Sequence, residues 1–217
     1  MSRLFNPDSP VMQFLTRVAD LVILNVLWLV FSLPVITLGA STTALYRSLL
    51  TLIDGGGTST VLLFWNAFRS EFKTATLLFL ILLLPFAAVF LDLWILLFGT
   101  LSMSPLMRGL CLLPVLLFFM AANYVYPLTA QFENTLKGTL KNAVLLALAN
   151  LPTSFAVLVL SLLPLLVFLL ATSFFLQSLI VWILLGFALI AQCNAYLLRR
   201  VFRKYFPPEE SGEISEI

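Results

Sequence analysis

Asp92 is the ionisable side chain of this sequence that most suggests chemistry, because it lies inside an apolar run. If that run is a helix crossing a lipid bilayer, Asp92 lies about 10 Å from its outer end. A carboxylate at that depth costs about 2–3 kcal/mol unless it is paired or hydrated, so it should face a bundle interior. Arg17 and Arg108 are possible partners, although Asp20 lies one helical turn from Arg17 and favours a simpler pair with it. Asp92 is predicted to form a structural ion pair or a polar site in an outward cavity.

Amide, phenol and hydroxyl groups are scattered through other apolar runs. Asn25 lies in the first run, and Asn123 and Tyr124 lie in a later one. The same class includes Tyr126, Thr129, Gln131, Glu133, Gln192 and Asn194. Such groups can line a route for an uncharged polar solute such as a sugar. They also bond neighbouring helices in membranes, at an average below about 1 kcal/mol each, and the sequence favours this second role.

A third candidate surface is an amphipathic helix. Its apolar face would carry Val61, Phe64, Trp65, Phe68, Phe72 and Ala75, and its polar face Asn66, Arg69, Ser70 and Lys73. This pattern is typical of a helix that lies in a membrane interface and connects two spans. The alternative is a docking helix for a partner protein, with Phe64, Trp65, Phe68 and Arg69 as the contact residues.

Catalytic and metal-binding patterns are missing from the sequence. It has no histidine, which is the commonest general base and metal ligand. Cys111 and Cys193 lie in apolar runs that should place them in opposite leaflets, so they are predicted to be unpaired core residues. The glycines at 55–57 lack the lysine of a phosphate-binding loop and indicate a linker. We therefore expect no enzyme activity, cofactor or metal.

The composition places the chain in a membrane. Its 217 residues are 61% hydrophobic and 10% charged, and its mean hydropathy is +1.08. Soluble domains are about half apolar and a quarter charged. The net charge of +2 is too small to indicate nucleic-acid binding. The first apolar run is too long for a cleaved signal peptide and is expected to remain as a span.

The apolar runs predict an all-α, polytopic membrane protein with about five spans. The predicted spans cover residues 11–38, 76–98, 106–131, 144–170 and 176–198. Helices at the cytoplasmic interface would fill the loop 41–74, with Ser41, Thr42 and Thr43 as N-cap candidates. Residues 1–198 would form one transmembrane domain and 199–217 a polar tail. The break between the last two spans, near 172–178, is weakly marked.

The basic residues favour one orientation of these spans. One side would hold Arg47, Arg69, Lys73, Lys137, Lys141, Arg199, Arg200, Arg203 and Lys204. The other would hold only Arg3, Arg17 and Arg108. Cytoplasmic loops are enriched in Lys and Arg, so the N-terminus is predicted outside and the C-terminus in the cytoplasm.

An internal repeat relates two parts of the chain. Residues 68–80, FRSEFKTATLLFL, align without a gap with residues 136–148, LKGTLKNAVLLAL. A Leu-Pro follows each segment, ending at Pro85 and Pro152. The repeat predicts two parallel hairpins of spans plus one further span, although any two basic entries into a membrane could look alike.

Several motifs resemble the YesL family of bacterial membrane proteins. They are LPVITLGASTTALYRSLLTL from residue 33, FKTATLL from residue 72, and YVYPLTAQFENTLKGTLKNAVLLALANLP from residue 124. The resemblance covers residues 14–198, and the loop at 54–57 is not a feature of the family. It implies a five- or six-span protein of a bacterial cell membrane, commonly encoded beside genes for sugar import and glycan degradation. No functional residues follow from it.

These observations lead to two functional hypotheses. The first is an accessory or scaffolding partner of an ABC-type sugar importer, with the lipid bilayer and importer subunits as partners. The alternative is a stand-alone transporter or channel for a small polar solute such as an oligosaccharide. An ABC permease subunit is less well supported, because residues 44–85 contain only fragments of the expected Glu-Ala-Ala…Gly signature.

Overall fold

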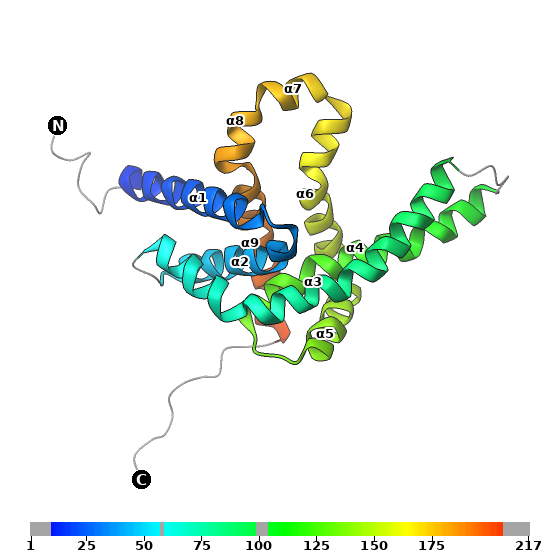
Figure 1. Cartoon of the computed structure of the whole chain (residues 1–217), viewed down its shortest axis with the longest axis horizontal. Helices are drawn as coiled ribbons and strands as arrows, with labels where there is room; N and C mark the ends of the chain where they lie inside the picture. The colour runs from blue at the N-terminus through cyan, green and yellow to red at the C-terminus, as the bar shows by residue number, and fades with distance from the viewer. Residues whose placement is uncertain (1–9, 57–58, 99–103, 206–217) are drawn as a thin grey trace, which may run out of the picture.

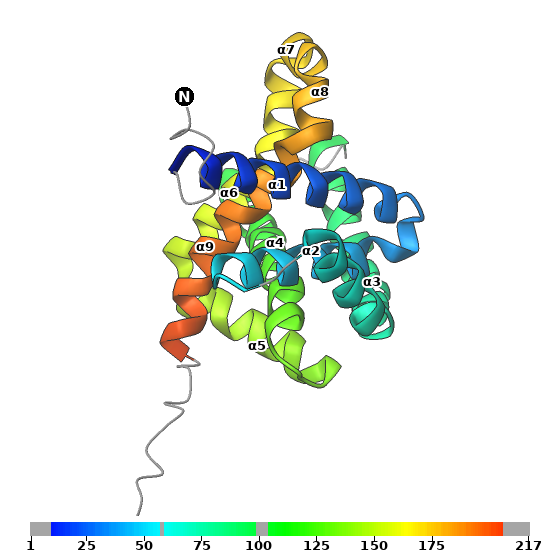
Figure 2. The same cartoon turned by 90° about the vertical axis from the view of Figure 1, so that its left-hand side faces the viewer.

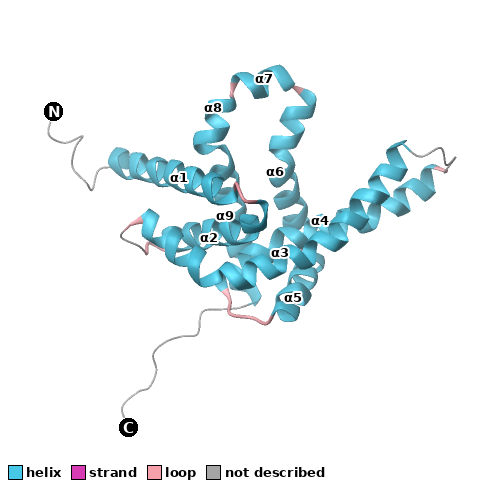
Figure 3. Cartoon of the chain, in the orientation of Figure 1, coloured by secondary structure: helices cyan, strands magenta, loops and turns pink. Residues whose placement is uncertain are grey.

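The computed structural model describes residues 10–56, 59–98 and 104–205. Figure 3 shows that these residues are helical apart from short connections, with no strand among them. The elements are α1 (Pro10–Ser32), the 3-10 turn η1 (Val35–Thr37), α2 (Leu38–Ile53), α3 (Thr60–Phe98), α4 (Pro105–Gln131), α5 (Leu136–Ala149), α6 (Leu151–Leu170), α7 (Thr172–Gln177), α8 (Leu179–Val181), the π-helical turn η2 (Trp182–Gly186) and α9 (Phe187–Tyr205).

Five helical segments in the described residues are long and apolar enough to cross a membrane. They are Pro10–Ser32, Thr60–Leu96, Leu106–Gln131, Leu151–Leu170 and Leu179–Tyr205. Large apolar side chains cover their outer faces, and Leu84 and Leu170 are 79% and 85% exposed. Such exposure suits a lipid environment. The expected class, an all-α polytopic membrane protein, is confirmed.

Helix α2 forms the centre of the molecule. Ten of its 16 residues are buried, and it packs against α1, α3, α4 and α9 (Figures 1 and 2). The approach to α3 is close because Gly39 has no side chain: a Cβ there would lie 2.5 Å from the Ala75 carbonyl oxygen. The sequence instead predicted this segment in an interfacial loop at 41–74. Small buried residues explain the difference, because they let helix backbones approach inside a membrane bundle.

The hydroxyls at the start of α2 lie inside the helix rather than at its N-cap. Thr42 Oγ1 and Thr43 Oγ1 donate to the carbonyl oxygens of Leu38 and Gly39, four residues earlier. The preceding turn η1 starts the helix early, and Thr37 occupies the N-cap without a side-chain capping bond. At the other end, Gly55 adopts φ +79°, which terminates α2 in the way glycine commonly does after a C-cap.

Helix α3 joins two elements that the sequence predicted separately, a helix at 60–74 and a span at 76–98. Its 39 residues are continuous, and Pro85 lies inside the helix without ending it. No glycine interrupts the stretch, so nothing separates its amphipathic beginning from its apolar end.

The predicted span at 144–170 is divided in the structure. Helix α5 ends at Ala149, Asn150 forms the junction, and α6 begins with Pro152 in its first turn. A residue that precedes a proline is disfavoured in the helical conformation, so Pro152 favours a helix boundary here. The two aligned repeat segments therefore differ, because one lies inside α3 and the other forms the separate helix α5.

The last predicted break, near 172–178, corresponds to α7, and α9 extends to Tyr205 rather than ending at 198. The rest of the predicted tail, residues 206–217, lies outside the described residues, as do Arg3 and Gly57. Two hairpins diverge from the centre in Figure 1, one formed by α3 and α4 and the other by α6 to α9.

Candidate functional site

A cavity of about 440 Å³ lies where five helices converge. Its walls come from α1, α2, α4, α6 and α9. The lining residues are Trp28, Thr42, Leu45, Tyr46, Ala122, Asn123, Tyr126, Ser161, Pro164, Leu165, Phe187, Ile190, Ala191 and Asn194. The volume falls within the range of small-molecule sites, and the lining combines apolar surface with a few polar groups, as such sites commonly do.

A chain of hydrogen bonds crosses one wall of the cavity. Asn194 Nδ2 on α9 donates to Ser161 Oγ on α6 at 2.9 Å. Ser161 Oγ donates to Asn123 Oδ1 on α4 at 2.6 Å. Asn123 Nδ2 then donates to the Phe119 carbonyl oxygen at 2.8 Å. These bonds fix three helices relative to one another and hold the Asn194 amide in one orientation.

Asn194 leaves one acceptor unused. Its residue is 1% exposed, and Oδ1 is one of two buried side-chain polar atoms without a partner among the described residues; the other is Thr76 Oγ1. The Asn194 side chain lies close enough to the Tyr46 hydroxyl to lower the pKa of that phenol. The hydroxyl nevertheless makes no hydrogen bond to Asn194 Oδ1. A buried oxygen without a partner carries a desolvation cost of about 1–3 kcal/mol. The atom has essentially no accessible surface, so it lies behind the cavity wall rather than on it.

Aromatic rings form a second wall. The rings of Trp28 and Phe187 lie 5.2 Å apart between centroids. Trp28 Nε1 donates to Thr42 Oγ1 at 3.1 Å, so the indole is held at a fixed angle. Together with Tyr46 and Tyr126, these rings offer flat apolar faces beside the polar wall.

The cavity is uncharged, because none of its lining residues is Asp, Glu, Lys or Arg. Burial raises the pKa of Tyr46 to about 12, and the neighbouring Asn194 side chain acts in the opposite direction. The phenol therefore remains a neutral donor over the physiological pH range. The site can bind an uncharged polar molecule, but it offers no charge to an ion.

Four of the amide and phenol residues singled out in the sequence do not line the cavity, namely Asn25, Tyr124, Gln131 and Gln192. Tyr124 is fully buried, and its hydroxyl bonds Ser154 Oγ at 2.8 Å, which joins α4 to α6. Asn25 is also fully buried and bonds the π-helical turn η2. Tyr124 and Asn25 make the helix-to-helix bonds that the sequence favoured for this class of residue.

Among the described residues, the charged candidates Arg17, Asp20 and Asp92 form no ion pair with one another. Arg17 donates to the Leu52 carbonyl oxygen at 2.7 Å, and Asp20 accepts from Thr60 Oγ1. Neither contact is the expected pair between Arg17 and Asp20. Asp92 is half-buried on α3, and no hydrogen bond or ion pair involves its side chain within the part of the chain that the structure describes.

The predicted docking helix is partly internal. Phe64 and Phe68 are buried and pack against Phe31 of α1, with ring centroids 5.7 Å and 4.9 Å away. Trp65 and Arg69 are exposed. Only the second pair is available for contact with a partner, because the first pair anchors α3 to the core.

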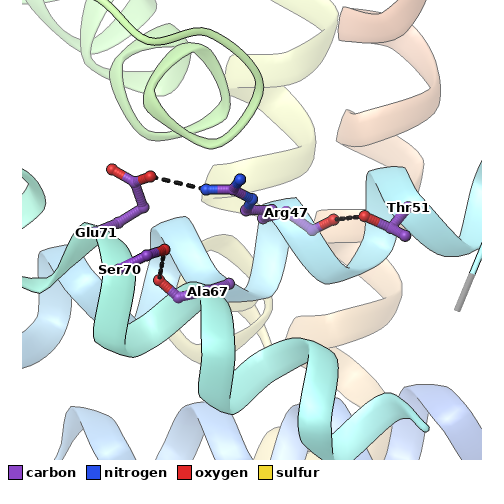
Figure 4. A network of polar contacts seen from close by, with 5 residues as sticks. All are labelled: Arg47, Thr51, Ala67, Ser70 and Glu71. Atoms are coloured by element: carbon purple, nitrogen blue, oxygen red, sulfur yellow. Dashed lines mark hydrogen bonds and ion pairs between the residues drawn. The ribbon is translucent and has the colours of Figure 1, made fainter. Parts of the chain in front are cut away.

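Sequence reasoning did not identify Ser161, Thr42 or Tyr46 as cavity residues. A lone serine in an apolar helix was the only signal for Ser161. Sequence reasoning also missed Glu71. Its carboxylate accepts a hydrogen bond from Arg47 at 2.7 Å and joins α3 to α2, as Figure 4 shows. Among the described residues, no group of His, Cys, Asp and Glu is placed to hold a metal ion.

Comparison with known proteins yields one match. Residues 21–93 match a family model described as a protein of unknown function, DUF624. The matched region runs from the middle of α1 through α2 and most of α3. No curated protein and no solved structure matches the chain.

Proposed function

We propose that this membrane protein binds a small, uncharged, hydroxyl-bearing solute in the five-helix cavity and carries it across the bilayer. The observation that supports this function best is the polar wall of the cavity, where half-buried Ser161 and Asn123 are joined by a hydrogen bond beside the aromatic rings. Apolar walls with a few fixed polar groups are suited to a small neutral polar ligand.

The rest of the lining favours the same ligand class. Tyr46 remains protonated and can donate to a hydroxyl oxygen. Trp28 and Phe187 offer apolar faces to the carbon skeleton of a polyol or sugar. A charged ligand would lose its hydration without gaining a counter-ion, which disfavours ions. No lining group titrates near neutral pH, so the cavity lacks an acid or base of the kind that catalysis commonly uses.

Binding and flux measurements test this function. Purified protein in lipid nanodiscs is titrated with glycerol, xylitol and glucose, with gluconate as the charged comparison. Asn194→Leu should reduce affinity for the bound polyol at least tenfold, because it removes the bond that holds Ser161 at the polar wall. Asn150→Leu, which changes an asparagine outside the cavity, should leave affinity unchanged. Absence of binding to all three neutral solutes, or equal effects of both variants, would refute the proposal.

An accessory role beside an ABC-type sugar importer is a second candidate. It rests on the YesL resemblance, which the match at 21–93 is compatible with, and on the apolar faces of the diverging hairpins. Trp65 and Arg69 would be further contact points. Tagged protein should then retain an importer subunit through mild detergent extraction. Recovery of the protein alone would favour independent transport.

We infer a bacterial cell membrane as the location, from the same resemblance, with the basic end of α9 on the cytoplasmic face. Arg17 of α1 binds Leu52, while Arg199 and Arg203 of α9 pair with Asp54 two residues further on. The beginning of α1 and the end of α9 therefore meet at the same end of α2. A cytoplasmic N-terminal end would require an even number of crossings, with one of the five candidate segments not crossing the bilayer, whereas the expected outside N-terminus requires all five to cross. We propose the first arrangement on the strength of the contacts at α2. Impermeant thiol labels at Gln13→Cys and Tyr205→Cys should then react from the same side.

A further inference from the structure

The π-helical turn η2 lies where the chain enters α9. Trp182–Gly186 form bonds to the fifth residue rather than the fourth, which is rare and occurs mostly at functional positions. Gly186 is required here: a Cβ would lie 2.4 Å from Trp182 Cε3, so the indole covers the glycine. The turn therefore has a defined side-chain arrangement rather than a loose backbone.

Asn25 of α1 supplies the polar contacts of this turn. Its Nδ2 lies 3.2 Å from the Trp182 carbonyl oxygen and 2.6 Å from that of Ile183, and it donates to both. Its Oδ1 accepts from the Ala188 amide at 2.7 Å. The Asn25 side chain is fully buried, so water does not compete for these hydrogen bonds. One amide thus bonds two carbonyl oxygens at the start of η2 and one backbone amide just after its end.

The turn directly precedes Phe187, which is a wall residue of the cavity. Phe187 lies 6.0 Å from Trp182 and 5.2 Å from Trp28, measured between ring centroids. Trp28 lies three residues after Asn25, so the two occupy neighbouring positions on one face of α1. Asn25 therefore fixes the backbone that carries Phe187, from the same helix face that carries its aromatic partner.

We propose that Asn25 is a positioning residue for the cavity, which holds η2 in its π-helical form and thereby places Phe187 against Trp28. Its role in ligand affinity rests on the proposed solute-binding function. Its role in holding η2 does not.

Hydrogen exchange tests the placement without any ligand. Asn25→Leu in nanodiscs should raise amide exchange at residues 182–188 at least tenfold, because the contacts to η2 and Ala188 are lost. Exchange in α4 and α5 should remain within about twofold of wild type. Asn25→Asp keeps an acceptor for the Ala188 amide and should fall between wild type and Asn25→Leu. Asn150→Leu serves as the matched control. Unchanged exchange at 182–188 in Asn25→Leu would overturn the proposal.

A deletion separates positioning from general destabilisation. A π turn holds one residue more than the α-helical bonding pattern, so deletion of the exposed Leu184 should restore bonds to the fourth residue. In that background, Asn25→Leu should change exchange by less than about twofold, because the displaced carbonyls no longer need the amide. A tenfold effect in both backgrounds would refute the specific link to the π turn.

Xylitol titration tests the consequence for the cavity. Asn25→Leu should weaken xylitol binding at least fivefold and change the tryptophan emission, since Trp28 and Trp182 both border Phe187. Failure of xylitol to bind wild-type protein counts against the proposed function, whereas the exchange data still decide whether Asn25 holds η2. Normal xylitol affinity in Asn25→Leu, together with raised exchange, would overturn its role at the cavity.

Discussion

Helix α2 and the C-terminal half of α3 reverse the relation between apolarity and burial that soluble proteins follow. Buried positions of α2 include Gly39, Ser41, Thr43 and Ser48, which are small or hydroxyl-bearing. The C-terminal half of α3 is almost entirely apolar, yet its large side chains are exposed, with Phe90 at 57%.

The difference follows from the solvent. Lipid tails are as apolar as leucine, so burying a leucine in the bundle gains little. Close backbone packing and hydrogen bonds between helices favour small and polar residues instead. The central helix of this protein is therefore recognisable by its small residues, and the lipid-facing segment by its large ones.

Substitutions at two glycines should give the largest contrast. Gly39→Leu should destabilise the protein by about 3 kcal/mol, because its side chain collides with the Ala75 backbone and Phe79. Gly109→Leu is the matched control, since a Cβ there meets no atom within 4 Å. Thermal unfolding in one detergent compares them. Equal losses at both sites would contradict the assignment of α2 as the packed centre.

The second largest effect on stability is expected at alkaline pH, through the buried Tyr46. Its pKa is raised from 10.0 to about 12, so the folded state retains the phenolic proton more tightly than the unfolded chain. The resulting stabilisation is complete below pH 10 and is lost as pH rises towards 12. It is on the order of 2–3 kcal/mol. Tyr46→Phe should remove this part of the pH dependence in chemical unfolding curves. Identical alkaline profiles for both proteins would contradict it.

A single buried bond should have a smaller effect. Tyr124→Phe removes the bond to Ser154 and should cost about 1 kcal/mol, because Ser154 keeps its bonds to the Ala147 and Asn150 carbonyl oxygens. Trp94→Phe, at an exposed position of α3, should change stability by less than about 0.5 kcal/mol. A larger loss for Trp94→Phe would indicate that the exposed face of α3 is covered.

Local sequence features predicted some of the site residues. Asn123, Tyr126 and Asn194 were recognised because polar groups are unusual in apolar helices, and all three line the cavity. Their neighbour Ser161 was missed, because one hydroxyl in a helix can be satisfied by its own backbone and gives no signal of a partner. Asp92 drew attention for its charge, yet it lies on α3, which contributes no residue to the cavity lining.

Composition and apolar run length determined that this chain is a helical membrane protein, because lipid requires every span to satisfy its own backbone bonds. They predicted about five spans, and five helical segments of spanning length and apolarity are present among the described residues. Only the tertiary structure decided that α2 is central, that Asn25 reaches η2, and that Asn123, Ser161 and Asn194 meet. The hydrogen bonds involved join residues 33 to 163 positions apart in the sequence. They depend on how the helices pack, and no local pattern encodes which helix faces meet. The physical reason is that helix periodicity is a local property, whereas the choice of neighbouring helix depends on shape and bonding across the whole bundle.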